Sequence, residues 1–389
     1  MQVENYELFE VRPKWVFLKI ETSSGAVGWG EPTLARQSSS LQAAVTDMME
    51  QYIIGEDPAD IEDHWQKMYR NGFYRGGPVL MSALAGIDQA LWDLKGKQFG
   101  APVYELLGGK ARDRIRLYQH VHTANGGIKS PQEVGEDAAA QVEAGFTSLK
   151  MTITNGLRRV DTPEKVHEAV ARLEAVREAV GNGVDVGLDL HGRASKPMAK
   201  RLVTALEPYE PMFYEEPVLP EQADSFPEIA ARTSIPIAAG ERMHSRWDCK
   251  QAFENQAVDI IQPDLSHAGG ITEVHKIAAM AEAYDVALAP HCPLGPISLA
   301  ACLQIDACAP NALFQEQVLH RADIADFDVF RYVANDIMFD YDEQGFVDLP
   351  SGPGLGIEMD EEAVREHAIE DLRWQSPMWR HEDGSLAEW

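Results

Sequence analysis

From about residue 113 onwards, short apolar runs alternate with longer segments whose apolar residues recur about every 3.6 positions. Alternating strands and helices build a parallel sheet with right-handed crossovers. Eight parallel strands close a barrel, whereas a doubly wound open sheet is the competing architecture. The eight runs are Ile115–Tyr118, Thr147–Met151, Val184–Asp189, Pro211–Glu216, Ile235–Ala239, Asp259–Gln262, Val286–Ala289 and Ala312–Gln315.

The segment before this alternation, residues 1–112, mixes strand and helix patterns. Val16–Glu21 alternates in the manner of a strand, and a Ser-Ser-Gly turn leads into a second strand pattern at Ala26–Gly30. Leu41–Gln66 and Met81–Lys97 have the apolar spacing of helices. We therefore expect a separate α+β domain here.

After about residue 325 the alternation stops, and turn residues such as Gly345 and Pro350–Gly354 become frequent. The chain then ends in a segment rich in tryptophan: Trp374, Trp379 and Trp389. We expect this tail to pack back on the N-terminal piece. The sequence thus divides into three parts: 1–112, 113–325 and 326–389.

The charge balance limits the partners. Lys and Arg number 34 against 62 Asp and Glu, giving a net charge of −28. Such a surface repels nucleic acid and anionic membranes, so we expect neither as a partner. It also repels itself unless salt screens it. We interpret the acidity as adaptation to a high-salt cytoplasm, and an ordinary acidic mesophile protein is the alternative.

Several absences indicate a cytoplasmic enzyme. The four cysteines form no CxxC pair, which is typical of thiols in a reducing compartment. The start, MQVENYELFEV, has no basic segment followed by an apolar run, so we expect no secretory signal. The longest apolar stretches are far shorter than a membrane span.

Three acidic residues stand at the ends of successive runs: Asp189, Glu215 and Glu241. Both intervals are 26 residues (215 − 189 and 241 − 215), about one strand–helix unit. We therefore expect all three at one level of the C-terminal mouth, where barrel enzymes place their chemistry. The alternative is that each acid caps the next helix. Because converging carboxylates need a hard divalent cation, we favour a Mg²⁺ site.

Two histidines belong to the same level. His191 lies two residues past Asp189, so on an extended backbone both side chains point the same way. His291 follows the seventh run, and Asp264 at the end of the sixth could orient it, which fixes the imidazole tautomer and raises its basicity. Glu316 ends the eighth run. The alternative for each histidine alone is a structural residue.

A magnesium ion flanked by acid and base groups suits proton removal next to a carboxylate. The resulting enediolate carries two negative charges on oxygen, which a cation and a hydrogen-bond donor must stabilise. A second group opposite the base can protonate the other face, which is epimerisation. It can instead protonate a departing β-hydroxyl, which is dehydration. A catalytically inactive binding protein is a third hypothesis, disfavoured because every acid, base and ligand position is filled.

Many ordered motifs carry a family likeness that runs nearly end to end. On them the chain resembles the D-galactonate dehydratase family, in the mandelate racemase subgroup of the enolase superfamily. The motifs are Gly28-Trp29-Gly30-Glu31-Pro32, Phe73-Tyr74-Arg75-Gly76-Gly77-Pro78, Gly86–Asp93, Leu188–Arg193, Glu215–Leu219, Ala238–Met243, Gln262–Gly270, Ala289–Pro296 and Trp379–Asp383.

The resemblance implies a modified (β/α)7β barrel capped by an α+β domain that both termini build. It implies Mg²⁺ on the three acids, with His291 and Asp264 as the base that removes the C2 proton. His191 would be the acid that assists loss of the C3 hydroxyl. Glu316 would donate a hydrogen bond to the substrate carboxylate, for which it must be protonated, as neighbouring anions favour. The product would be a 2-keto-3-deoxy sugar acid.

The candidates for contacting the aldonate substrate are Lys150, Thr152, His122 and Arg242. Many relatives have a second lysine as a base where Thr152 stands, so the threonine disfavours racemase or epimerase chemistry. Lys150 is interpreted as a partner of a carboxylate or of the metal shell, and the alternative is a strand-end lysine that faces solvent.

The identity of the aldonate stays open at this point. The loops 120–129 and 155–162 and the region 319–332 differ from the family pattern, and they are expected where distal hydroxyls are read. D-Galactonate, D-gluconate and D-xylonate are therefore all candidates. Relatives form symmetric oligomers, so a homo-oligomer is expected.

Overall fold

A computed structural model describes residues 1–121, 129–154, 156–320, 328–370, 372 and 378–388 of the chain. Its centre is a ring of parallel strands in the order β10-β9-β8-β7-β6-β5-β4-β11. These are β4 (Arg114–Val121), β5 (Ser148–Thr152), β6 (Asp185–Asp189), β7 (Tyr214–Glu215), β8 (Ile237–Ala239), β9 (Ile260–Ile261), β10 (Ala287–Leu288) and β11 (Gln315–Glu316).

The ring closes where β10 meets the chain that leads into β11. Leu288 forms a parallel bridge with Ala312. The Leu288 amide donates to the carbonyl of Asn311 at 2.9 Å, and the Leu313 amide donates to the carbonyl of Leu288 at 2.9 Å. The predicted barrel is therefore confirmed, and the doubly wound open sheet is wrong.

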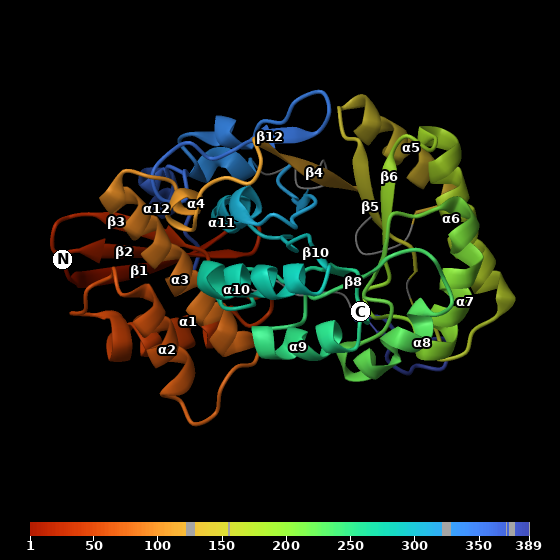
Figure 1. The fold of residues 1–389 in the computed structure, drawn as a ribbon, viewed down its shortest axis with the longest axis horizontal. Helices are drawn as coiled ribbons and strands as arrows, with labels where there is room; N and C mark the ends of the chain where they lie inside the picture. Colours follow the sequence, from red (N-terminus) through yellow and green to blue (C-terminus); the bar gives the residue numbers. More distant parts are fainter. Residues whose placement is uncertain (122–128, 155, 321–327, 371, 373–377, 389) are drawn as a thin grey trace.

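Helices fill every interval between successive strands of the ring, as a (β/α)7β barrel requires. Proline at the first turn favours helix initiation at Pro131 and Pro163, and Ser130 forms a capping box with Glu133. Helices α5 to α7 lie on the side away from the N-terminal sheet (Figure 1). The helices are α5 (Pro131–Glu143), α6 (Pro163–Val180), α7 (Lys196–Leu206), α8 (Phe226–Ala230), α9 (Arg246–Glu254), α10 (Gly270–Ala283) and α11 (Pro296–Cys308), with short 3₁₀ turns η3 (Glu207–Tyr209) and η4 (Pro220–Ser225).

Aromatic side chains fill the inside of the barrel. Tyr118, Phe213 and Phe314 form a buried cluster with three aliphatic residues from neighbouring strands. Gly187 on β6 faces this cluster, and a Cβ there would collide with the ring of Phe213. The barrel is therefore a packed core rather than a pore, and the open end with polar side chains is the mouth.

The N-terminal part is a three-stranded antiparallel sheet, β1-β2-β3, backed by helices. It is drawn in red and orange at one end of the molecule in Figure 1. Helix α3 approaches β3 closely because Gly28 and Gly30 lack a Cβ that would collide with its carbonyl oxygens. The elements are β1 (Val3–Val11), β2 (Trp15–Thr22), β3 (Val27–Gly30), α1 (Ser38–Met48), the π-helix η1 (Met49–Ile53), α2 (Ile61–Arg70), α3 (Pro78–Phe99) and α4 (Val103–Leu106).

The helical spacing of Leu41–Gln66 does not correspond to one helix. The helix stops after Ile53 and starts again at Ile61. Gly55 in the break has a φ of 84°, a conformation that glycine adopts at little cost, and Pro58 cannot donate a helical hydrogen bond. The periodicity is interrupted at these two residues.

The C-terminal part packs on the N-terminal sheet, as expected. Tyr332 contacts the rings of Trp15 and Phe17, and Lys19 donates to Glu361 at 2.8 Å. Strand β12 instead extends the barrel sheet, antiparallel to β4. The elements are η6 (Val329–Tyr332), η7 (Asp336–Phe339), β12 (Phe346–Asp348) and α12 (Glu361–Glu366). The division of the chain at residues 112 and 325 stays a prediction, and residue 325 is outside the described residues.

No helix within the described parts of the chain is long and apolar enough to cross a bilayer.

Candidate active site

Four carboxylates stand at the mouth, at or just beyond the carboxyl ends of strands. Asp189, Glu215 and Glu316 are the last residues of β6, β7 and β11, whereas Glu241 lies two residues beyond β8. Asp189 and Glu215 are register partners, so the equal level predicted for them is confirmed. The register partner of Glu215 on β8 is Ala238, not Glu241. The backbone register therefore pairs only two of the three acids, and an equal level for Glu241 stays a prediction.

Lys150 lies between two of these carboxylates. Its Nζ is 2.7 Å from Glu215 Oε1 and 2.9 Å from Glu316 Oε1, and the side chain is 2 % exposed. It also lies over the ring of Tyr118 at 5.3 Å. Burial would lower the pKa of Lys150, but Glu215 and Glu316 raise it well above its ordinary value. The alternative of a lysine that faces solvent is therefore wrong.

Glu316 contacts Lys150, His120 and the backbone amide of Cys292. His120 Nε2 is 2.7 Å from its Oε1, and the Cys292 amide donates to its Oε2 at 3.0 Å. Burial would raise the pKa of Glu316, but Lys150, His291 and His120 bring it well below its ordinary value. The expectation that Glu316 is protonated is therefore wrong, because cations rather than anions dominate its surroundings.

His291 and Asp264 form the predicted pair. His291 Nδ1 is 2.8 Å from Asp264 Oδ2, and a parallel bridge joins the two backbones beyond β9 and β10. The other nitrogen, Nε2, is 3.1 Å from Glu241 Oε2. Burial would lower the pKa of His291, but Glu316, Glu241 and Asp264 raise it to about 10. His291 is thus held between Asp264 at Nδ1 and Glu241 at Nε2.

His191 contacts Asp189 through a backbone conformation that the sequence did not predict. Its φ is 50°, so the backbone is left-handed rather than extended, and that part of the prediction is wrong. The His191 amide still donates to Asp189 Oδ1 at 2.6 Å, and its Nδ1 is 2.9 Å from Asp189 Oδ2. Arg242 Nη2 donates to the His191 carbonyl at 2.8 Å. Burial would raise the pKa of Asp189, but His191 and Lys150 lower it.

The predicted substrate contacts occupy different surroundings. Thr152 Oγ1 is 3.5 Å from His191 Nδ1, so it borders the mouth. Arg242 is half-buried, with its Nε 3.2 Å from Glu241 Oε1. His122 is outside the described residues.

Three polar residues at the mouth were missed. Glu216 accepts from the Gly240 amide at 2.9 Å, and its pKa is raised to about 8 by burial and by Glu241. Gln262 donates to Glu215 Oε2 at 3.0 Å. Glu31 accepts from the amides of Gly295 and Ser298, beside the loop of His291. Each of these residues belongs to one of the family motifs in the sequence. Nothing in the sequence, however, distinguished it as a site residue from the other residues of its motif.

The donor set at the mouth fits a hard cation. Burial, together with Asp189, Glu316 and Glu241, raises the pKa of Glu215 to about 8. The raised pKa indicates that the neighbouring cationic groups do not fully balance the negative charges of these acids. Carboxylate oxygens are the ligands that Mg²⁺ prefers. Among the described residues no three acidic, histidine or cysteine side chains already converge as a ligand group. Asp189 instead faces His191, Glu215 faces Lys150 and Glu241 faces His291, so joint coordination would require these acidic side chains to turn.

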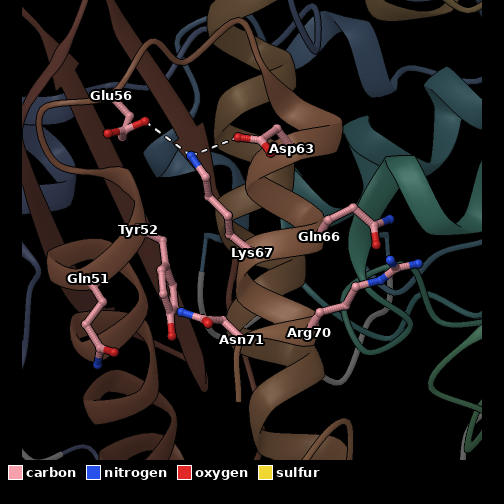
Figure 2. A pocket seen from close by; sticks show the side chains of 8 residues that line it. All are labelled: Gln51, Tyr52, Glu56, Asp63, Gln66, Lys67, Arg70 and Asn71. Atoms are coloured by element: carbon pink, nitrogen blue, oxygen red, sulfur yellow. Dashed lines mark hydrogen bonds and ion pairs between the residues drawn. The ribbon is translucent and has the colours of Figure 1, made fainter. Parts of the chain in front are cut away.

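A surface hollow of about 550 Å³ lies on the N-terminal domain, away from these residues (Figure 2). Residues of η1, of α2 and of the chain around them line it, and Lys67 in its wall is paired with Glu56 and Asp63. None of its lining residues belongs to the mouth. Because Lys67 is already paired with these two carboxylates, we assign the hollow no chemistry.

Family models match most of the chain. The model for the mandelate racemase / muconate lactonizing enzyme N-terminal domain matches residues 11–108, and the enolase C-terminal domain-like model matches residues 133–363. D-galactonate dehydratases from Variovorax paradoxus and Ralstonia pickettii are each 52 % identical over 389 residues, covering 100 % of both chains. The chain belongs to the D-galactonate dehydratase family. The resemblance found in the motifs is thereby confirmed.

Solved structures of the wider superfamily share the fold. A mandelate racemase/muconate lactonizing enzyme from Jannaschia sp. CCS1 superposes with a TM-score of 0.86 at 32 % identity, covering 95 % of this chain and 98 % of that one. An enolase from Agrobacterium radiobacter, solved with bound Na and L-malate, gives a TM-score of 0.88 at 29 % identity over 100 % of both chains. This chain thus shares its capped barrel fold with these structures.

Proposed function

We propose that the protein is an acid-sugar dehydratase, a hydro-lyase whose substrate is D-galactonate. It removes the proton on C2 and the hydroxyl on C3, and the resulting enol becomes a 2-keto-3-deoxy sugar acid. One observation carries the proposal: the acid and base candidates stand on opposite sides of one barrel mouth, in a chain 52 % identical over its full length to D-galactonate dehydratases.

The strand order supports the division into acid and base. His191 follows β6 and His291 follows β10, and three strands separate these two on either side of the ring. A substrate held between them presents one face to each histidine. Asp264, 2.8 Å from Nδ1, would stabilise the imidazolium that forms when His291 takes the C2 proton through Nε2. His191, held by Asp189, would give a proton to the departing C3 hydroxyl.

Asp189, Glu215 and Glu241 would hold Mg²⁺. When bound, the cation supplies positive charge to stabilise the two oxygens of the developing enediolate. Arg242 and Thr152 border the same space, and we propose them, with Lys150 and His122, as residues that orient the sugar acid. Since Glu316 is ionised, its proposed task is to hold Lys150 and His120 rather than to donate a hydrogen bond.

The metal assignment has its own test. Isothermal titration of the purified protein with MgCl2 should give a binding isotherm that Asp189→Asn weakens strongly. Glu221→Gln, on an exposed surface, is the matched control and should bind as the wild type does. Unchanged Mg²⁺ affinity in the Asp189 variant would remove this residue from the ligand set.

The function is tested with a panel of aldonates in the presence of Mg²⁺ and KCl. We expect D-galactonate to give an α-keto acid, detected as its semicarbazone. Keto acid only from D-gluconate or D-xylonate would correct the substrate and keep the reaction. Exchange at C2 in D2O without keto acid would favour an epimerase, and no change to any aldonate would favour an inactive binder.

We also propose a homo-oligomer in which a second copy covers the loop between α2 and α3. Phe73 and Tyr74 in this loop are 91 % and 85 % exposed, and Arg75 gives it a positive charge that complements the acidic surface of another copy. Light scattering should show a multimer for the wild type and smaller species for Phe73→Ser/Tyr74→Ser. Monomeric wild-type protein would contradict this proposal.

The proposed location is the cytoplasm, and the proposed ligand is a small acid rather than nucleic acid or lipid. The four cysteines are free, and three of them are buried, which agrees with the expected reduced thiols. Fractionation of the native cells would test the location directly. Recovery of the enzyme outside the cytoplasmic fraction would overturn it.

A further inference from the structure

The loop that carries His191 is held in an unusual backbone conformation. His191 has a φ of 50° and the next residue, Gly192, a φ of 67°. A left-handed conformation costs energy at a residue with a Cβ and persists only where the surroundings enforce it. The Gly192 amide donates to the carbonyl of Glu216 at 2.7 Å, and Arg242 binds the His191 carbonyl. These contacts fix the loop from the side of β7 and β8.

Arg193 fixes the loop from the opposite side. The residue is 8 % exposed, and its Nη1 donates to the carbonyl of Thr154 beyond β5 at 3.0 Å. Its Nε is buried and has no hydrogen-bond partner. The guanidinium lies 4.6 Å from the ring of Trp379, so an aromatic face takes the place of the missing partner.

Trp379 belongs to a small hairpin near the end of the chain, Met378–Glu388. A bridge between Arg380 and Leu386 pairs its two arms, and the Ala387 amide donates to the carbonyl of Trp379 at 3.0 Å. A second tie to the barrel, Arg158 Nη2 to Glu382 Oε2 at 3.1 Å, joins two exposed side chains. Such a pair contributes little, so Trp379 is the principal attachment.

We infer that this C-terminal hairpin is a strap over the mouth, and that Trp379 is a positioning residue for His191. The ring packs on Arg193, Arg193 holds the loop to the β5 side, and the loop keeps His191 beside Asp189. The inference rests on the proposed function where it assigns His191 as the acid. The strap itself rests only on contacts in the structure.

The assignment predicts a selective effect of Trp379→Ala. Dehydration of D-galactonate should fall about tenfold or more, mainly in kcat, because the acid is misplaced. Exchange of the C2 proton in D2O should persist, since His291 stands on the far side of the ring. Trp379→Tyr keeps an aromatic face and should recover most of the rate. Glu382→Gln, in the same hairpin, is the matched control and should behave as the wild type.

Hydrogen–deuterium exchange measured by mass spectrometry separates the strap from the proposed reaction. In Trp379→Ala, amides of residues 190–195 should exchange faster, with no change in α10 on the far side of the barrel. This result does not depend on any substrate. Equal exchange of 190–195 in the variant and the wild type would overturn the strap. Equal loss of dehydration and C2 exchange would overturn the positioning of His191. An inactive wild type with a protected loop would reject the proposed function alone.

Discussion

Lys150 pairs with two carboxylates of the mouth at once. With Nζ within 2.9 Å of both Glu215 and Glu316 and almost no exposure, it is part of a buried ionic cluster. Removing one partner of such a cluster leaves the other charged groups buried, away from water and without a counter-charge. Lys150 is therefore the shared cationic partner of both carboxylates.

Lys150→Met should therefore destabilise the protein. We expect the free energy of unfolding to fall by about 3–5 kcal/mol, because two carboxylates lose their shared cation. Urea titration followed by circular dichroism measures this change. Lys165→Met is the control, since Lys165 is exposed and pairs with Glu168 on the surface, where a pair contributes at most about 1 kcal/mol. A loss no larger than in the control would contradict the role given to Lys150.

His291→Asn removes the proposed base while keeping a polar side chain of similar size. The rate of C2 exchange should fall by about a thousandfold, since general base catalysis contributes roughly that much. NMR of D-galactonate in D2O measures the exchange. His275→Asn, on helix α10 outside the mouth, should leave it unchanged. Exchange that survives in His291→Asn would reassign the base.

For individual residues, the sequence predicted which side chains pair more successfully than it predicted their charge states. Asp264 and His291 were paired correctly because they end adjacent strands. The ionised state of Glu316 was missed because Lys150 and His120 come from other strands, and no local pattern reports their distance to it. The left-handed conformation of His191 was missed because such conformations are set by surrounding contacts.

The first residues of two barrel helices donate hydrogen bonds to carboxylates of the N-terminal domain. Glu31, directly after β3, accepts from the amides of Gly295 and Ser298 at the start of α11. Asp88 on α3 accepts from the amide and hydroxyl of Thr272 at the start of α10. Helix amides favour an acceptor at that end, so these contacts dock the cap on the barrel.

These carboxyls make stability depend on pH. Burial raises the pKa of Glu31 and of Asp88 to about 7. The folded state therefore binds their protons more tightly than the unfolded state. Their contribution is complete below about pH 4 and is lost as pH rises through 7. Each accounts for on the order of 3 kcal/mol across that range.

Melting temperatures measured from pH 5 to 8 test this dependence. Wild-type stability should include a component that falls with rising pH, and Glu31→Gln/Asp88→Asn should lose that component. Glu221→Gln, on an exposed surface, should keep the wild-type profile. Parallel profiles for the double variant and the wild type would show that neither carboxyl holds a proton at neutral pH.

The sequence predicted which helices and strands exist more successfully than it predicted where each one begins and ends. Each of the eight predicted strands contains or overlaps an observed strand, because apolar runs between helices have few alternatives in a barrel. The break between η1 and α2 was missed because apolar spacing resumes in register after Gly55 and Pro58. The pairing of β12 with β4 joins residues more than 200 positions apart and has no local signal.

The whole molecule carries 28 net negative charges on 389 residues. Mutual repulsion of this size opposes compaction unless counterions screen it. A few of these acidic residues are buried at the mouth, and most of the others in the described parts of the chain lie on the surface. The high-salt interpretation rests on the net charge of the whole molecule, because no single residue decides it.

The melting temperature should rise steadily between low and molar KCl. Screening reduces repulsion more in the folded state, where the charges are closer together. Differential scanning calorimetry at fixed pH measures the effect, with the substrate and Mg²⁺ left out so that binding does not add to it. A melting temperature independent of KCl would contradict the high-salt interpretation and favour an ordinary acidic protein.

At this scale the architecture was largely predictable, and the strap was not. The barrel and the α+β cap follow from the periodicity and the family motifs, which agree with each other. Trp379 was visible as part of a motif, but its contact with Arg193 closes a distance of 186 residues along the chain (379 − 193). Such contacts arise from the assembled fold, so a sequence read segment by segment does not reveal them.

Dehydration of D-galactonate at this mouth, as proposed above, begins with removal of the C2 proton. The most direct measurement is ¹H NMR of D-galactonate incubated in D2O with the protein, MgCl2 and KCl. We expect the C2 proton signal to disappear while a 2-keto-3-deoxy acid, carrying deuterium at C3, accumulates in equal amount. D-Galactonate that stays unchanged, or that yields only its C2 epimer, would contradict the account.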